Sequence, residues 1–132
     1  MEQDYDPFEA LKNKRAATKN DGELEEYEAF RIGQRRQNRL EIRQCLSPHH
    51  TPSYFHLLDI IPNGFFGTEI VLIYTFLIVE IQGKNLRPLY DSLKAGNCEY
   101  IQDFHENVFL PADPKKPFID SIKVTSKNQI ST

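Results

Sequence analysis

Residues 68–96 read TEIVLIYTFLIVEIQGKNLRPLYDSLKAG, and this stretch decides the expected fold. Residues 68–82 are apolar on both faces of an extended chain near their centre, which is typical of a strand in the middle of a sheet. We expect this long strand to carry a bend or bulge. Gly83-Lys84-Asn85 ends it, and Gly96 closes the helix that follows. The helix is predicted from apolar residues at helical spacing: Leu86, Leu89, Tyr90 and Leu93.

Short apolar segments on either side of this stretch predict four more strands. They lie at residues 39–46, 54–61, 98–104 and 118–124. Pro62-Asn63-Gly64 predicts a tight turn, because Asn and Gly accept positive φ values. The predicted fold class is α+β, a small antiparallel sheet in the order strand, strand, strand, helix, strand, strand, with the helix packed on it. We expect the core to include Ile73, Phe76, Ile78, Leu89 and Leu93.

Charge divides the N-terminal region into two blocks. Residues 1–30 hold nine acidic and four basic residues, whereas residues 31–43 hold five arginines and one acidic residue. Weak helices are predicted after Asp6 and over residues 21–31, with too few apolar residues to stand alone. We therefore expect three parts, which are a charged, partly helical arm (residues 1–38), a core domain (39–124) and a frayed tail (125–132).

Composition places the chain among small globular domains. It has 132 residues, 39% of them hydrophobic, and a net charge of −3, which differs from the basic composition of many nucleic-acid-binding proteins. The apolar run Ile70–Val79 is too short to span a bilayer, and the acidic N-terminus lacks the apolar segment of a signal peptide. We expect an intracellular, cytoplasmic protein without membrane contact, in which Cys45 and Cys98 are reduced thiols.

The arginine segment, residues 31–43, is the most suggestive feature for binding. It mixes arginines with amide side chains, a combination that suits phosphates and base edges. The alternative is that the arginines are solvated or pair with the acidic residues 23–28. Further positive charge lies where the predicted helix begins, a place that favours anions, although Gly83 and Asn85 also serve as turn residues there. The candidate nucleic-acid or anion-binding residues are Arg31, Arg35, Arg36, Arg39, Arg43, Lys84 and Arg87.

The histidines and acidic residues form no recognisable catalytic or metal-binding motif. His49 and His50 are adjacent, so on an extended chain their side chains point to opposite sides. His56 and His105 are distant from them and from each other, and a pocket that gathers these two with Asp59 and Asp103 stays an open alternative. We assign no catalytic residue, no metal ligand and no cofactor from the sequence.

Three functional classes follow. The first is a non-enzymatic protein-interaction domain of adaptor, regulatory or assembly type, whose partner is a second copy or another protein; Phe65 and Phe66 beside the tight turn would be its apolar contact. The second is a nucleic-acid-binding accessory protein that uses the arginine segment, for which we expect weak, salt-sensitive binding. The third is a small enzyme or ligand-binding domain with a pocket between the helix and residues 106–117.

Overall fold

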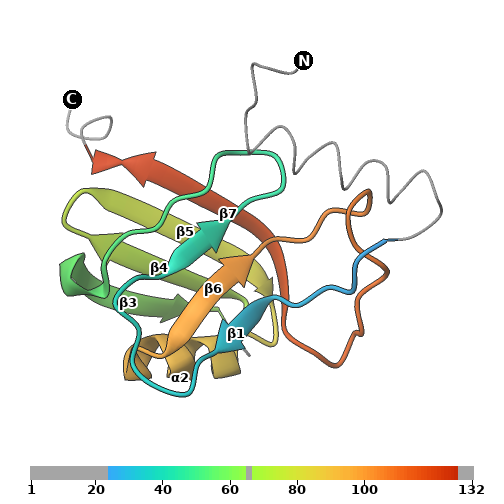
Figure 1. Cartoon of the computed structure of the whole chain (residues 1–132), viewed down its shortest axis with the longest axis horizontal. Helices are drawn as coiled ribbons and strands as arrows, with labels where there is room; N and C mark the ends of the chain where they lie inside the picture. Colours follow the sequence, from blue (N-terminus) through green and yellow to red (C-terminus); the bar gives the residue numbers. More distant parts are fainter. Residues whose placement is uncertain (1–23, 65–66, 128–132) are drawn as a thin grey trace, which may run out of the picture.

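The structure is a computed structural model that describes residues 24–64 and 67–127 (Figure 1). These residues form two β-sheets and one α-helix, so the predicted α+β class with a single helix is confirmed for the described chain. A four-stranded sheet has the order β3-β4-β5-β7, and a three-stranded sheet the order β1-β6-β2. The elements are β1 (Phe30–Ile32), β2 (Glu41–Arg43), β3 (Leu57–Asn63), β4 (Glu69–Tyr74), β5 (Leu77–Lys84), α2 (Arg87–Ala95), β6 (Cys98–Gln102) and β7 (Phe118–Ser126), and a short 3-10 turn, η1, covers Tyr54–His56.

The long strand predicted over residues 68–82 is a hairpin. β4 and β5 pair antiparallel, with Ile73 opposite Ile78 and only Thr75 and Phe76 between the strands. Neither residue is the Gly, Asn or Asp that is typical of a two-residue turn, so the sequence did not indicate that the chain reverses here. The bend or bulge that the sequence predicted here is a complete reversal of the chain.

The hairpin also corrects the predicted core. The buried face of the two strands consists of Ile70, Leu72, Tyr74, Leu77, Val79 and Ile81. Ile73 and Ile78 are half-buried on the opposite face, and Phe76 in the turn is 47% exposed, so their assignment to the core is wrong. Both faces of the segment are apolar, and side chains alternate along a strand, so the sequence pattern could not say which set faces inward.

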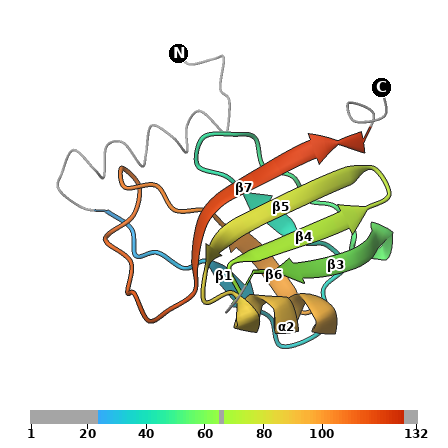
Figure 2. The ribbon, with the colours of Figure 1, turned by 180° about the vertical axis from the view of Figure 1, so that it is seen from behind.

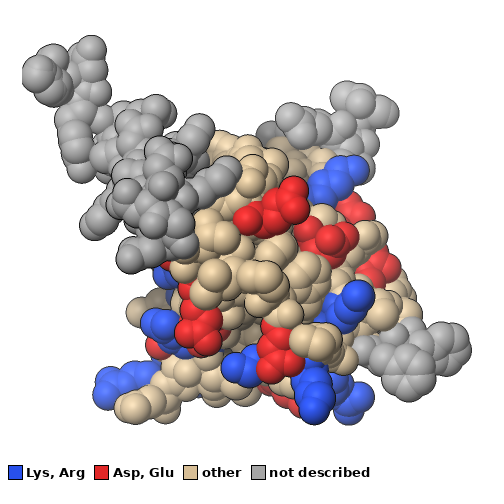
Figure 3. Space-filling view, turned by 90° about the vertical axis from the view of Figure 1, so that its right-hand side faces the viewer, with Lys and Arg blue, Asp and Glu red and all other residues tan. Residues whose placement is uncertain are grey.

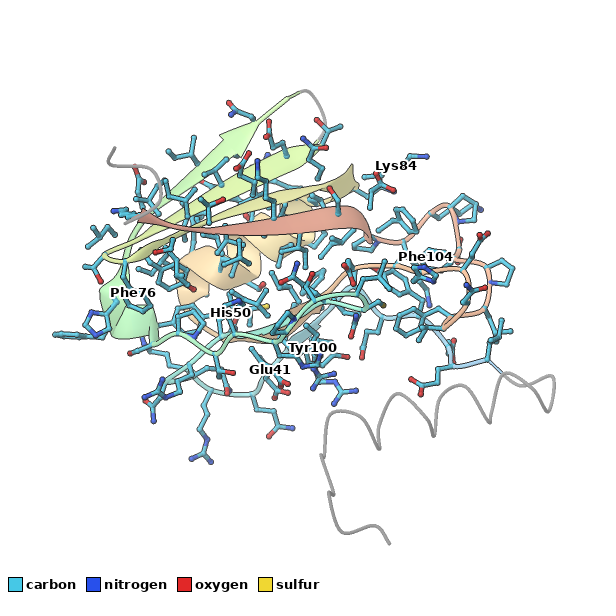
Figure 4. All side chains as sticks on the ribbon, turned by 90° about the horizontal axis from the view of Figure 1, so that it is seen from above. Glu41, His50, Phe76, Lys84, Tyr100 and Phe104 are labelled. Carbon is cyan, nitrogen blue, oxygen red and sulfur yellow. The ribbon has the colours of Figure 1, made fainter. Side chains whose placement is uncertain are left out.

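The single antiparallel sheet that the sequence predicted is divided into two. β2 pairs parallel with β6, and β1 pairs antiparallel with the same strand. Seen from above, the two sheets face each other with α2 at one side between them (Figure 4). The helix contacts β3 and β6, and the predicted burial of Leu89 and Leu93 is confirmed at 0% and 2% exposed.

The described part of the N-terminal region packs into the fold. Residues 24–31 are extended and lead into β1, so the helix predicted over 21–31 is wrong where the structure describes it. Ala29 is buried and Tyr27 packs against the core, an alternation that suits a strand. At the other end, β7 continues to Ser126, beyond the predicted start of the tail. The helix predicted after Asp6 lies outside the described residues. Within residues 24–64 and 67–127, no helix has the length and apolar character needed to cross a membrane.

Candidate interaction surfaces

Two residues of the arginine segment flank one aromatic ring on the three-stranded sheet. The guanidinium carbons of Arg31 and Arg43 lie 5.3 Å and 3.7 Å from the ring centroid of Tyr100. Arg31 pairs with Glu28 at 3.0 Å, and Arg43 pairs with Glu41 at 3.2 Å. Both guanidinium groups are therefore engaged by carboxylates and by the ring within the chain itself.

The ring between these arginines is closed to a ligand. Tyr100 is 5% exposed, and its hydroxyl donates a hydrogen bond to Glu28. Burial, together with the neighbouring Glu28 carboxylate, raises the pKa of Tyr100 to about 12, so the hydroxyl keeps its proton near neutral pH. A nucleic-acid base stacks on an exposed aromatic face, and Tyr100 does not offer one.

The other candidate cations have different contacts. Arg39 donates from Nη1 to the carbonyl of Thr51 at 2.9 Å, while Arg35 and Arg36 are exposed in the loop before β2. Arg87 lies on α2 and pairs with Asp91 at 3.6 Å. Figure 4 places Lys84 and Tyr100 on opposite sides of the molecule. The candidate nucleic-acid residues therefore do not all lie on one surface, because Lys84 lies away from the arginines that flank Tyr100.

The histidines are separated as well. His56 lies on η1, where its ring contacts Phe76, whereas His105 follows Phe104 in the connection between β6 and β7. Phe76 and Phe104 are at opposite ends of the molecule (Figure 4). The open possibility of one pocket that gathers His56 and His105 is therefore excluded. In the part of the chain that the structure describes, no three His, Cys, Asp or Glu residues are grouped to hold a metal ion.

Cys98, one of the two cysteines that the sequence predicted to be reduced, is a free thiol. Cys98 is fully buried at the start of β6, and burial raises the pKa of its thiol to about 12. Because the thiolate is the reactive form, Cys98 is inert near neutral pH. Phe65 and Phe66, the predicted apolar contact, lie outside the described residues.

An open cavity of about 530 Å³ lies beside the connection between β6 and β7. Its walls are apolar and come from the chain before β1, from this connection and from the start of β7: Leu24, Phe104, Phe109, Pro111, Ala112, Pro114 and Phe118. Three charged residues complete the lining: Lys84, Glu106 and Asp113. Figure 3 views this end of the molecule and shows uncharged surface bordered by acidic and basic side chains. We call this cavity the aromatic pocket.

Tyr27 packs behind the phenylalanines that line the aromatic pocket. Its hydroxyl donates to the carbonyl of Gln102 at 2.7 Å and accepts from the N–H of Ile119 at 3.0 Å. Its ring packs against three phenylalanine rings at centroid distances of 5.0–5.7 Å: Phe104, Phe109 and Phe118. Burial raises the pKa of Tyr27 well above its ordinary value, so the proton that Gln102 accepts stays in place. One tyrosine thus joins β6 to β7 and fixes the rings.

The rim of the aromatic pocket is fixed by polar contacts. Asn85, in the left-handed region at φ 56°, donates from Nδ2 to the carbonyls of Pro114 and Lys116 at 3.3 Å and 3.4 Å. Asp113 accepts from the backbone N–H of Lys115 at 2.9 Å. These contacts tie the proline-rich connection to the end of β5 and limit the movement of the rim.

A second group of aromatic side chains lies at the other end of the molecule, where η1 meets the turn between β4 and β5. Phe55 is 88% exposed, and its ring meets His56 at a centroid distance of 5.7 Å. His56 in turn meets Phe76 at 5.8 Å. We call these three residues the exposed aromatic end.

The outer face of the four-stranded sheet is a third apolar surface. Figure 2 shows this face from behind, with no described element lying over it. Four apolar side chains lie on it, half-buried or exposed, together with Glu80 opposite Val71: Ile61, Val71, Ile73 and Ile78. An antiparallel sheet with one solvated face normally carries polar side chains there, so this face is a competing candidate for contact with another molecule.

No family model, curated protein or solved structure matches this chain. The sequence predicted a pocket between the helix and residues 106–117, and a cavity of about 560 Å³ lies there, lined by residues at the start of α2 and by Lys115 and Pro117. Reasoning from sequence missed the aromatic pocket. The structure places this pocket between residues 106–117, Leu24 and the ends of β5 and β7. The available signal was the spacing of Phe104, Phe109 and Phe118 around three prolines. Nothing in the pattern connected those rings to Tyr27.

Proposed function

We propose that this chain is a non-enzymatic protein-interaction domain, and that its aromatic pocket receives a large apolar side chain from a partner. The observation that supports the proposal is the open cavity, whose wall includes half-buried Phe104 and Phe118. The ring of Tyr27 packs against both of these rings. Apolar cavities of this size with a few polar groups around them are typical binding sites. A pocket whose shape is already fixed loses little conformational entropy when it binds.

The chemistry of the lining favours binding over catalysis. No serine, cysteine, threonine or histidine is among the described residues that line the cavity. Asp113 accepts a backbone hydrogen bond in its own turn, and Lys84 and Glu106 are exposed. These groups suit the orientation of a charged neighbour of the anchor, since exposed charges contribute more to orientation than to affinity.

The affinity for a single anchor is expected to be weak. Complete burial of one aromatic side chain contributes about 3 kcal/mol, and ring-to-ring contacts add about 1 kcal/mol. A total of about 4 kcal/mol corresponds to a Kd of about 1 mM at best. A partner that adds contacts around the anchor would bind more tightly, as anchor residues in protein interfaces do.

The test is a titration with N-acetyl-L-tryptophanamide as the probe. The chain contains no tryptophan, so all tryptophan emission comes from the probe. We expect a saturable blue shift with the wild type, and at least tenfold weaker binding to Ala112→Arg. Ala112 lines the pocket, and an arginine there would fill it while Glu106 and Asp113 are available to pair with its charge.

The matched control is Leu46→Arg, which adds the same charge at a side chain that is 79% exposed and does not line the pocket. This control should bind the probe like the wild type. Equal thermal unfolding of both variants would show that the fold is retained. A probe response that does not saturate, or that Ala112→Arg leaves unchanged, contradicts the proposal.

A further inference from the structure

Phe55 is presented to solvent by a turn whose neighbouring residues are fixed. The adjacent Tyr54 donates its hydroxyl proton to the carbonyl of Cys98 at 2.7 Å, which anchors η1 on β6. The hydroxyl of Ser53 accepts from the N–H of Phe55, and the carbonyl of His56 accepts from the N–H of Thr75, both at 3.0 Å. The Phe55 ring is therefore held outward on a stiff support, as is typical of an anchor residue that binds without reordering.

The structure supplies a cavity of matching chemistry at the opposite end. Phe76 of the exposed aromatic end and Phe104 of the aromatic pocket lie at the two ends of the molecule (Figure 4). Phe55 contacts His56, which contacts Phe76, so Phe55 cannot reach the pocket of its own chain. An encounter between this ring and this pocket requires two molecules.

The charges around the two surfaces are complementary. Ser53 lies two residues before Phe55 and pairs with Arg39 in an isolated β-bridge. The backbone N–H of Lys127 donates to the carbonyl of Phe76. These two bases lie near the exposed aromatic end together with one acidic residue, Asp59, which pairs with Ile73 beside the turn. The pocket lining carries two acidic residues, Glu106 and Asp113, against one base, Lys84. Opposite charge favours the encounter and its orientation.

We infer that the partner of the aromatic pocket is a second copy of this chain, whose Phe55 ring enters the pocket. This inference rests on the proposed function. Each copy carries one donor ring and one acceptor pocket on opposite ends, so the contact is head-to-tail, and an open assembly keeps a free Phe55 at one end and a free pocket at the other. Such a contact extends into chains of molecules instead of closing as a symmetric pair.

The first experiment compares self-association by sedimentation equilibrium of the full chain over a concentration series that reaches the millimolar range. We expect the weight-average mass of the wild type to rise past two copies. Phe55→Ser and Ala112→Arg should each associate at least tenfold more weakly. Leu46→Ser is the matched control, because it removes an exposed apolar side chain that touches neither surface, and it should behave like the wild type.

The second experiment mixes the two variants in equal amounts. Phe55→Ser keeps an intact pocket, and Ala112→Arg keeps an intact Phe55, so one productive contact remains possible between them. We expect the mixture to form a pair with the affinity of the wild-type contact, and its mass to stop at two copies. A symmetric contact through the outer face of the four-stranded sheet would not show this pattern, because each variant alone would still form pairs.

Several results overturn the inference. These are a wild type that remains monomeric throughout the series, a Phe55→Ser variant that associates like the wild type, or a mixture that fails to pair. None of them decides the proposed function, because the tryptophanamide titration measures the pocket independently. If Ala112→Arg loses the probe and the wild type stays monomeric, the pocket binds an apolar anchor and its partner is another protein.

Discussion

The two aromatic groups of this protein share one kind of hydrogen bond but differ in how far their phenylalanine rings are exposed. In each, a tyrosine hydroxyl donates to a backbone carbonyl of β6 at 2.7 Å, Tyr27 to Gln102 at one end of the strand and Tyr54 to Cys98 at the other. Tyr27 stands in the middle of its group, and the phenylalanines pack around it. Tyr54 stands beside its group and points inward, which leaves Phe55 outside.

In both groups, the exposure of a phenylalanine ring depends on where it lies relative to the anchored tyrosine. Phe109, which packs edge-on against Tyr27, is 5% exposed, whereas Phe55, next to Tyr54 in the chain, is 88% exposed. Adjacent residues point in different directions, so anchoring one of them inward can hold the next one outward. The first arrangement makes a stable cavity, and the second presents a ring.

The largest effect is expected from Tyr27→Ala. This change removes a packed ring from among three phenylalanines and leaves the carbonyl of Gln102 and the N–H of Ile119 without their partner. Loss of a large aromatic residue from a core destabilises by about 3–5 kcal/mol. Urea unfolding measures the change, and binding of the tryptophanamide probe should be lost with it. A decrease in the free energy of unfolding below about 1 kcal/mol would mean that Tyr27 does not hold the three phenylalanines in place.

A smaller effect is expected from Tyr54→Phe, which keeps the ring and removes only the hydroxyl that joins η1 to β6. The unpaired carbonyl of Cys98 should cost about 1–3 kcal/mol. Amide exchange at Phe55, His56 and Thr75 should accelerate more than exchange in β6, because η1 loses its anchor. Tyr90→Phe, at a half-buried tyrosine on α2, is the control. Equal exchange rates in wild type and Tyr54→Phe would contradict the anchoring role.

How far the sequence predicted these regions depends on how local the decisive contacts are. The burial of Leu89 and Leu93 was predictable, because the spacing and the closing Gly96 lie within one short segment. The hairpin at Thr75-Phe76 was not, because its turn lacks the usual residues. The contact between Tyr27 and Gln102 could not be predicted, since the two residues are 75 positions apart in the chain. Neither belongs to a recognisable pattern in its own segment.

The arginine segment was clear in the sequence, but the contacts of its side chains were not. The sequence shows five arginines close together along the chain, but it does not show which face each one occupies. Arg31 and Arg43 lie on two strands that flank β6, where Tyr100 and the acidic neighbours engage them. These two guanidinium groups are therefore engaged within the chain, which the sequence alone did not indicate.

The buried thiol at the start of β6 should make stability depend on pH. In the unfolded chain the Cys98 thiol ionises near its ordinary pKa of 9, whereas burial raises its pKa in the folded chain to about 12. Between these values the unfolded state has released a proton that the folded state still holds, so stability falls as pH rises. One fully released proton changes the free energy of unfolding by about 1.4 kcal/mol per pH unit. Because the unfolded thiol is only partly ionised below pH 9, we expect Cys98 to lower the free energy of unfolding by about 1 kcal/mol between pH 8 and 10.

Urea midpoints at pH 8 and pH 10 for wild type and Cys98→Ala measure this contribution. The variant leaves a small cavity and should be less stable at both pH values. The informative quantity is the slope between them, which should be shallower in Cys98→Ala. Parallel slopes would mean that the thiol is not held protonated in the fold.

The smallest effect on stability is expected from Phe55→Ala, and it completes the comparison with Phe109. A side chain that is 88% exposed is already hydrated in the folded state, so its removal changes little between folded and unfolded chains. We expect the free energy of unfolding to change by at most about 0.5 kcal/mol, against about 3–5 kcal/mol for Phe109→Ala. Both are measured at low protein concentration, where self-association does not add to apparent stability. A ring that can be removed without loss of stability, on a turn fixed by Tyr54, is available for contact with another molecule. A large loss in Phe55→Ala would instead make Phe55 part of the fold and remove the reason to treat it as an anchor.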